Sequence, residues 1–329
     1  MNTLPLGIAG GRVQKIANSH RRKTRFCAKM VLMLGTIGLF LRSNDNDYQQ
    51  RLKEVGLREA KRQGFDIVLE SAQNDPTRQV EQIRAAIANA PTTKLTAILV
   101  SSVRDDVLPD VVREAAEAGL DWALLNEGTF IDAIHDQYPS QAIFVVSPDQ
   151  LEIGRIHGRQ VRALVGSTGK VLCVTGPLTT VMAQQRLDGL KEILAGDFSL
   201  IELNADWTSE RARMAVERWA GELATDAELP GMFVAHNDEM ALGVRQALRD
   251  AASQRDLPLA TAPITGCDGA QTFGQRLVRE GRIKATVIMP PASGAAIEWI
   301  ARIRTRGERP PVRVLQPVTS FPNVSGLKR

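Results

Sequence analysis

The stretch FVAHNDEMALG, residues 233–243, decides the fold class of this chain. It joins a short apolar run, typical of a buried strand, to a segment whose apolar residues recur at helical spacing. Asn237 stands between the two where a helix N-cap belongs, and Asp238 and Glu239 follow in the first turn, where acids complement the helix dipole. Alternatively, Asn237 points into a cleft at the carboxyl end of a parallel strand, where open α/β sheets bind ligands.

The same alternation of apolar runs and amphipathic segments extends along the chain and predicts parallel sheets built from βαβ units. Ten strands are many for one compact sheet, and 329 residues suffice for two lobes, so we expect a seam near Val146 and Ser147. Residues 308–316, with two prolines, are expected to form the final connection. The predicted strands are residues 37–42, 66–70, 97–100, 122–125, 143–146, 170–174, 200–204, 232–235, 263–265 and 284–288, and the predicted helices are residues 48–62, 151–164, 182–194, 209–223 and 292–304.

The composition is typical of a soluble globular protein, with 43% apolar and 24% charged residues. The formal charge of +4 depends on residues 1–29, which carry seven Lys and Arg and no acid. Removing these seven from the 41 basic residues leaves 34, against 37 Asp and Glu. The rest of the chain is therefore mildly acidic, which gives no sign of a nucleic-acid-binding surface.

The N-terminal segment has features of a secretory signal that conflict with the predicted first strand. Basic residues precede the apolar run MVLMLGTIGLFL, which is too short to span a membrane. The overlapping stretch GTIGLFLRSNDNDY also fits a first strand and its ligand loop, so cleavage after the apolar run would remove that strand. Cys27 lacks the small neighbours of a lipoprotein site. Either the leader is unusual, the true start lies elsewhere, or the protein stays in the cytoplasm.

No arrangement of residues in the sequence indicates an enzyme, a metal site or a cofactor. The four histidines lack metal-ligand spacing, the three cysteines lack pairwise spacing, and no G-x-S-x-G elbow is present. GSTGK, residues 166–170, is too short for a phosphate loop and precedes a strand instead of following one. His236 is expected to line a polar cleft rather than to act in acid–base catalysis. Cys173 and Cys267 are expected to be buried small hydrophobic residues.

Several stretches that occur in order along the chain carry a resemblance to one family. They are TIGLFLRSNDNDYQQRLKEVGLREAKRQG and SAQNDPTRQVEQI in the first half, then MAQQRLDGL, NADW, FVAHNDEMALG, ITGCDG and KATVIMPPASGA in the second. The series resembles the ribose-type periplasmic sugar-binding proteins over about residues 34–329. The first stretch is similar to that family's first strand, ligand loop and helix.

The resemblance implies an α/β fold with two doubly wound parallel-sheet lobes, a three-crossing hinge and a ligand cleft between the lobes. The N-terminal lobe would comprise residues 34–146 and 290–316, the C-terminal lobe residues 147–289 and 317–329, and the basic leader residues 1–33. Lobe closure is a hinge transition, which a ligand drives only if it binds the closed state better. Amides, carboxylates and guanidinium groups suit paired sugar hydroxyls, and aromatic rings suit the C–H faces.

The resemblance also implies which residues bind the ligand. Tyr48 takes an aromatic stacking position, Trp207 covers the other ring face, and Arg186 matches the arginine of an R-x-x-G helix start. Asn237 then becomes a ligand-binding amide whose helix follows it. The expected ligand-binding residues are Asn46, Tyr48, Ser101, Asn126, Glu127, Arg186, Trp207, Asn237, Asp268 and Met289.

Several positions depart from the family's pattern. Asn126 falls where the family has an acid, and Glu127 replaces the arginine beside that acid. Gln49 replaces a second aromatic residue, Met289 an amide at the hinge strand, and Ser101 a common asparagine. These departures predict a ligand other than ribose, such as another sugar, a polyol or another small polar molecule. A neutral ligand is expected in preference to a sugar acid, because Glu127 would weaken the binding of an acid.

The function implied by the resemblance is capture of a sugar or polyol for an ABC transporter, without catalysis and without a cofactor. We expect a periplasmic monomer that contacts a transporter permease and no nucleic acid, although the atypical signal leaves the cytoplasm open. Two alternatives share the fold: a ligand-sensing partner of a membrane receptor or histidine kinase, and the core of a lactose-repressor-type regulator. The regulator is disfavoured because GRVQKIANSHRRKTR, within about 35 residues before the first strand, lacks a helix-turn-helix pattern.

Overall fold

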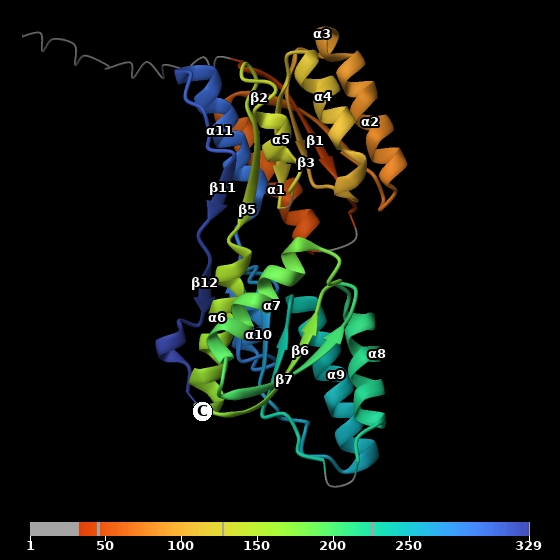
Figure 1. Ribbon diagram of the computed structural model, residues 1–329, viewed down its shortest axis with the longest axis vertical. Coiled ribbons are helices and arrows are strands. Elements are labelled where there is room, and N and C mark those ends of the chain that lie inside the picture. Colours follow the sequence, from red (N-terminus) through yellow and green to blue (C-terminus); the bar gives the residue numbers. More distant parts are fainter. Residues whose placement is uncertain (1–32, 45–46, 127, 225–226, 329) are drawn as a thin grey trace, which may run out of the picture. The chain divides into compact units, whose positions relative to one another are not determined.

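A computed structural model describes residues 33–44, 47–126, 128–224 and 227–328 of the 329-residue chain. Helices and strands alternate along these residues, and the strands form two six-stranded sheets (Figure 1). The strands are β1 (Gly35–Leu41), β2 (Phe65–Ser71), β3 (Leu95–Val100), β4 (Asp121–Leu125), β5 (Ile143–Pro148), β6 (Gly169–Thr175), β7 (Phe198–Asn204), β8 (Met232–Ala235), β9 (Ile264–Asp268), β10 (Ala285–Ile288), β11 (Arg313–Gln316) and β12 (Thr319–Phe321). The helices are α1 (Asp47–Gln63), α2 (Pro76–Ala88), α3 (Ala90–Thr93), α4 (Pro109–Glu117), α5 (Ile131–His135), α6 (Gln150–Val165), α7 (Val181–Leu194), α8 (Ser209–Gly221), α9 (Asp238–Arg255), α10 (Gly274–Arg279) and α11 (Ala292–Arg306), with 3₁₀ turns η1 (Asp105–Val107) and η2 (Val324–Gly326).

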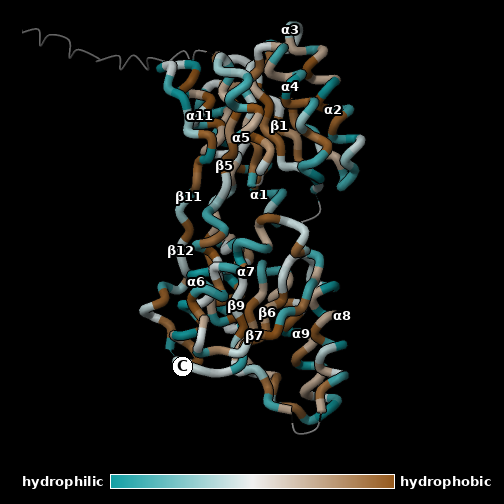
Figure 2. The backbone as a smooth tube through the Cα atoms, viewed as in Figure 1, coloured by the Kyte–Doolittle hydropathy of each residue, from teal (hydrophilic) through white to brown (hydrophobic). Residues whose placement is uncertain are grey.

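The first sheet and its helices form the N-terminal lobe. All its strand pairs are parallel, in the order β11-β5-β4-β3-β1-β2. Helices α1 and α11 pack on one face through residues such as Leu52 and Ile297, and α2, α4 and α5 pack on the other through residues such as Ile83 and Val112. Because both faces are covered, the central strands are continuous apolar runs, which Figure 2 shows as hydrophobic segments.

The second sheet and its helices form the C-terminal lobe, in the strand order β12-β10-β9-β8-β6-β7. Only β12 is antiparallel, through its pairing with β10. Helices α8 and α9 cover one face, and α6 and α7 cover the other. Helices α6 and α7 cross closely at Gly154 and Gly189, because a Cβ on Gly154 would lie 2.1 Å from the Arg186 carbonyl oxygen. This crossing brings the start of α6 against Arg186.

The chain passes between the two sheets three times. It leaves the first sheet after β5, returns after β10, and passes again between β11 and β12. The arrangement confirms the predicted fold class of two parallel-sheet α/β lobes joined by three crossings. The strand order also reverses beside β1 in the first sheet and beside β6 in the second, and such switch points are where open α/β sheets bind ligands.

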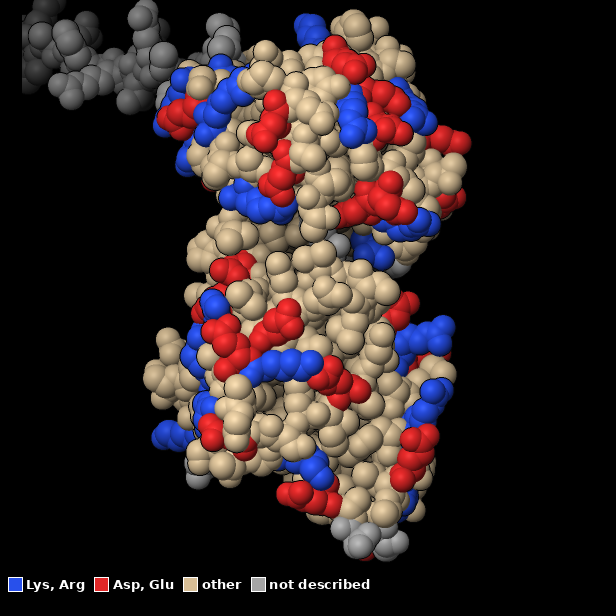
Figure 3. Space-filling view, viewed as in Figure 1, with Lys and Arg blue, Asp and Glu red and all other residues tan. Residues whose placement is uncertain are grey.

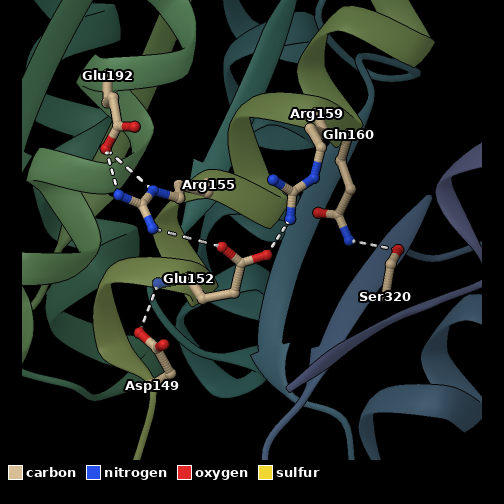
Figure 4. A network of polar contacts seen from close by, with 7 residues as sticks. All are labelled: Asp149, Glu152, Arg155, Arg159, Gln160, Glu192 and Ser320. Atoms are coloured by element: carbon tan, nitrogen blue, oxygen red, sulfur yellow. Dashed lines mark hydrogen bonds and ion pairs between the residues drawn. The ribbon is translucent and has the colours of Figure 1, made fainter. Parts of the chain in front are cut away.

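Polar contacts fix the start of α6, directly after the first crossing (Figure 4). The Asp149 carboxylate caps the helix by accepting from the Glu152 N–H at 2.9 Å. Arg155 pairs with Glu192 of α7 at 3.0 Å, and a side-chain hydrogen bond of 2.9 Å ties α6 to β12. Gln150, the first residue of α6, is therefore held in a defined position.

Basic and acidic side chains are interspersed over the face shown in Figure 3, and many form exposed ion pairs. Arg84 pairs with Glu114 at 2.7 Å, and Arg62 pairs with Glu298 at 2.7 Å, which links α1 to α11. Such exposed pairs contribute little to stability, because solvent screens them. The stability of both lobes therefore rests mainly on their apolar cores.

All ten predicted strands and all five predicted helices are present, with ends shifted by a few residues. Residues 308–316 were predicted to form the final connection; they lead into the last crossing, but Arg313–Gln316 also form strand β11 beside β5. Strand β12 was also not predicted. Both are short edge strands with exposed positions, so neither forms an apolar run. The predicted burial of Cys173 and Cys267 is confirmed.

Candidate ligand-binding site

The described site residues lie at the carboxyl ends of strands in both sheets, or in the segments that follow them. Ser101 follows β3 and Asn126 follows β4 in the first sheet. Asp268 ends β9, and Met289 follows β10, in the second. Because the carboxyl ends of parallel strands lie along one edge of a sheet, each lobe presents its candidate residues on a single edge.

In the N-terminal lobe, the start of α1 is bonded to the ends of two strands. The Tyr48 hydroxyl donates to Asn126 Oδ1 at 2.7 Å, and Gln49 Nε2 donates to Ser101 Oγ at 3.0 Å. Burial raises the pKa of Tyr48, and the negative charge of Asp268 raises it further. The phenol therefore remains a protonated donor at neutral pH.

Arg186 joins four segments of the chain, although its side chain comes from one helix. Its Nε donates to Gln150 Oε1 at 2.8 Å, and one terminal nitrogen donates to the His236 carbonyl oxygen. The other terminal nitrogen lies 3.3 Å from Met289 Sδ, and the guanidinium carbon lies 5.4 Å from the centre of the Trp207 ring. Arg186 is 3% exposed, so its charge is buried among neutral partners.

Trp207 occupies a restricted position against Gly176 and His236. A Cβ on Gly176 would lie 2.3 Å from the indole ring, so the close approach requires glycine. The rings of Trp207 and His236 lie 6.2 Å apart, and His236 Nδ1 accepts from the Gly176 N–H at 3.3 Å. Burial lowers the pKa of His236 well below its usual value, and Arg186 lowers it further. His236 is 1% exposed and its ring is therefore buried and neutral; a role of His236 in lining the cleft stays a prediction.

Asn237 is the N-cap of α9, which confirms the capping interpretation. Its Oδ1 accepts from the Met240 N–H at 2.7 Å, and its Nδ2 donates to the Trp207 carbonyl oxygen at 2.9 Å. Both ends of the amide are thus bonded within the protein. A second role of Asn237 in contacting a ligand stays a prediction.

Asp238 and Asp268 are buried carboxylates with different partners. Asp238 is 0% exposed and accepts from the Gly269 N–H at 2.8 Å and from Thr286 Oγ1 at 2.7 Å. The sequence assigned it to the helix dipole, but it also fixes the segment after β9. Burial raises the pKa of Asp238 well above its usual value. Burial likewise raises the pKa of Asp268 to about 7, although Arg186 and Arg51 act in the opposite direction.

Arg51 connects the two lobes and was not identified from the sequence. It comes from α1 of the N-terminal lobe and donates to the main-chain oxygen of Asp268 at 3.0 Å and to that of Met289 at 3.3 Å. A second link runs from the Asp47 N–H to Glu239 Oε1 at 3.3 Å. The start of α1 therefore contacts three segments of the C-terminal lobe, those that contain Glu239, Asp268 and Met289.

Three of the site residues have positive φ angles, which non-glycine residues rarely adopt. The values are 87° for Asn126, 52° for Trp207 and 99° for Asp268. Asn and Asp tolerate such angles better than most residues, whereas a bulky Trp is held there by its surroundings. Four further described residues, Gln73, Asn74, Lys94 and Asp256, also have positive φ angles outside the candidate site, so these angles restrict substitution at the three positions without identifying a site by themselves.

The structure does not test every residue predicted for the site. Asn46 and Glu127 lie outside the described residues, and their roles stay predictions. The sequence also gave no role to Gln150 or Arg51. Gln150 occupies the first position of a predicted helix, and Arg51 is one of several cations on α1, so no local signal distinguishes either residue.

Other features of the described residues bear on what the chain binds. A shallow depression lined by Leu34, Pro91 and Gly119 lies at the amino ends of β1 and β3, at the edge of the sheet opposite the candidate site. Within the described ranges, no group of three or more His, Cys, Asp or Glu residues could hold a metal ion. None of the helices in those same ranges combines the length and the hydropathy needed to cross a bilayer.

Two lobes of this topology, with polar and aromatic side chains at the carboxyl ends of their strands, define a two-lobed binding protein. The chain belongs to the periplasmic binding protein domain family, whose sequence profile matches residues 37–306. The resemblance inferred from the sequence is therefore confirmed.

Known members of this family are similar to the chain over most of its length. A putative rhizopine-binding protein of Rhizobium meliloti is 28% identical over 235 residues, which are 70% of this chain and 69% of the relative. The ribose import binding protein of Salmonella typhimurium is 24% identical over 278 residues, which are 83% of this chain and 86% of the relative. A crystal structure of a periplasmic solute-binding protein from Actinobacillus succinogenes, with bound D-allose, shares the fold at a TM-score of 0.74 and 20% identity, covering 87% of this chain and 96% of the other.

Proposed function

We propose that this chain is a solute-binding protein that captures a sugar or polyol between its two lobes for an ABC transporter. The observation that carries the proposal is the set of polar and aromatic side chains at the strand ends of both lobes, which Arg51 and Arg186 tie together. The name of the ribose import binding protein among the relatives supports a role in sugar uptake.

The site residues have the chemistry that a polyhydroxylated ligand requires. Asn126 and Asp268 offer oxygen acceptors, and Tyr48 offers a hydroxyl that both donates and accepts. Trp207 offers a ring face for the C–H groups of the ligand, at a position fixed by Gly176. Met289 and Ser101 stand where the resembling family has amides, so we propose a ligand other than ribose.

Arg186 has a supporting role in this proposal. Its donors already hold Gln150, the His236 carbonyl and Met289 in place, and its charge lies over the ring of Trp207. Arg186 therefore positions the groups that meet the ligand. The ligand can bond to Arg186 only through N–H groups that these partners do not already use.

Binding without turnover tests the proposal. Purified protein is screened by thermal shift against pentoses, hexoses and polyols, and each ligand that raises the melting temperature is recovered and analysed. The expected result is micromolar or tighter binding with chemically unchanged ligand. Binding should raise the melting temperature, because a ligand that binds only the native state stabilises it by RT ln(1 + L/Kd) at free ligand concentration L. Repeated conversion of a ligand over many cycles would show an enzyme instead.

The periplasm is the proposed location, as in the family to which the chain belongs. Fractionation of cells that express the native gene, with N-terminal sequencing of the mature protein, tests this. Recovery of the protein with an intact leader from the cytoplasmic fraction would contradict the proposal.

The proposed partner is the permease of an ABC transporter. Pull-down from membranes with ligand-loaded protein should recover a permease. Recovery of a receptor or histidine kinase in its place would assign the chain to sensing rather than transport.

A further inference from the structure

The Asp268 carboxylate is buried and accepts no hydrogen bond from the part of the chain that the structure describes. Asp268 is 8% exposed, and no described residue donates to its side chain, although its main-chain oxygen accepts from Arg51. A buried carboxylate without donors is costly, so such groups normally take a proton or acquire a partner. At the carboxyl end of β9, within the candidate site, the missing donor can come from a ligand.

The two arginines nearest to Asp268 do not supply that donor. Arg51 donates to two main-chain oxygens, and Arg186 donates to Gln150, to a main-chain oxygen and to Met289. Neither arginine forms an ion pair with any carboxylate in the part of the chain that the structure describes. Their positive charges lower the pKa of Asp268, but neither arginine donates a hydrogen bond to its carboxylate.

Further acids surround the same point. Asp47 and Glu239 both raise the pKa of Asp268 through their negative charges, and Asp268 in turn raises that of Asp238. The Asp47 Oδ2 atom is itself enclosed without a hydrogen-bond partner among the described residues. Among the described residues, the titratable and charged groups that face Asp268 are thus three further carboxyls, Asp47, Asp238 and Glu239, two guanidinium groups, Arg51 and Arg186, and the Tyr48 phenol.

This arrangement favours a cation with N–H donors. The carboxyl groups at this point outnumber the two guanidinium groups, neither of which pairs with a carboxylate among the described residues, so a positive charge added beside Asp268 relieves repulsion and supplies the missing donor. A metal ion fits poorly, because no group of three or more potential ligands within the described residues could hold one. An ammonium group, with three donors on one atom, fits a carboxylate of this kind.

We infer that the physiological ligand is an amine-bearing polyol or sugar whose protonated amino group pairs with the Asp268 carboxylate. The inference rests on the proposed function and narrows its ligand class. The hydroxyls of such a ligand would meet Tyr48, Asn126 and Trp207, while the ammonium group would occupy the acidic side of the site.

Matched pairs of ligands test the inference. Titration calorimetry would compare D-glucosamine with D-glucose, D-galactosamine with D-galactose, 1-amino-1-deoxysorbitol with sorbitol, and an aminodeoxyinositol with myo-inositol. At least one amine is expected to bind about tenfold or more tightly than its neutral twin, because a charge-assisted hydrogen bond is roughly twice as strong as a neutral one. In Asp268→Asn this preference should disappear, whereas Asp110→Asn, an exposed acid on α4, should retain it.

The pH dependence of the unmodified protein gives a second readout that needs no variant. Pairing with a cation requires the ionised form of Asp268, so binding of the amine should release a proton and strengthen as pH rises from about 5.5 to about 7.5. Calorimetry in two buffers of different ionisation enthalpy measures the proton release, which the neutral twin should lack.

The outcomes separate the inference from the proposed function. Amine preference that is lost in Asp268→Asn, or that is accompanied by proton release, supports the inference. If neutral polyols or sugars bind and their amino twins bind no better in any pair, the inference is overturned while the proposed function stands. If neither class binds, both are overturned.

Discussion

Replacement of Arg186 by methionine should destabilise the C-terminal lobe even without a ligand. Methionine keeps an unbranched apolar side chain but none of the guanidinium donors. The Gln150 side-chain oxygen and the His236 carbonyl oxygen would each lose a donor, and Arg186 itself is only 3% exposed, so water cannot readily replace it.

The expected loss follows from these contacts. Each buried acceptor left unpaired costs about 1–3 kcal/mol. Loss of the cation over Trp207, at 5.4 Å, adds about 0.5–1 kcal/mol, while removal of a buried charge partly offsets both terms. A net loss of about 2–4 kcal/mol should lower the melting temperature by about 5–15 °C for a unit of this size.

Differential scanning calorimetry of Arg186→Met beside Arg159→Met provides the assay. Arg159 lies on α6 and pairs with Glu152, but the two side chains are 40% and 33% exposed, so its loss should cost at most about 1 kcal/mol. Equal melting temperatures for the two variants would refute the argument that Arg186 holds buried acceptors. Arg186→Lys should fall between the parent and Arg186→Met, because one ammonium group cannot reach all the acceptors.

Three further predictions concern the same lobe. Gly176→Ala should displace the Trp207 ring, because the new Cβ would lie 2.3 Å from it; we expect a loss of stability of about 1–3 kcal/mol and a shift in tryptophan emission. Gly221→Ala is the control, because no atom lies within 4 Å of its Cβ, and it should change neither stability nor emission. Equal behaviour of the two variants would contradict the packing argument. Burial lowers the pKa of His157 from 6.5 to about 3, so below pH 6.5 the unfolded state binds more protons than the folded state, and the free energy of unfolding should fall as pH drops. In His157→Gln, melting temperatures measured over the same pH range should fall less steeply. An unchanged pH dependence would show that His157 is not its cause. Trp207→Ala should weaken binding of the best ligand about tenfold and abolish the change in protein fluorescence on binding, both measured by fluorescence and calorimetric titration. Unchanged affinity in a folded variant would show that Trp207 does not contact the ligand.

The strands could be predicted from the sequence because their burial leaves a clear local signal. Strands β3 and β4 are buried along nearly their whole length and therefore appear as apolar runs. Strand β11 has alternating exposed positions, and its place in the sheet depends on pairing with β5 across a large sequence separation. Local pattern carries no information about such pairing.

The site could be predicted only as positions in the chain and not as contacts. Asn237 was recognised as a helix cap because its function there depends on adjacent residues. Gln150 is recognisable as the acceptor of Arg186 only once α6 and α7 cross, and Asp238 as a buried acceptor only once β10 lies beside β9. Sequence order therefore predicts which positions form the candidate site, while tertiary packing determines which side chains bond to one another.

The positive φ angles at Asn126, Trp207 and Asp268 have a consequence for redesign and for evolutionary change of specificity. Substitution at these positions is restricted by the backbone as well as by the ligand, and Gly, Asn and Asp are the residues that adopt such angles most readily. A mutant library for new ligands should therefore keep 126 and 268 within that small set and diversify Gln49 and Met289, whose φ angles are not positive. Among related proteins we expect the same difference: the acceptor at position 268, at the end of β9, should persist while positions 49 and 289 vary.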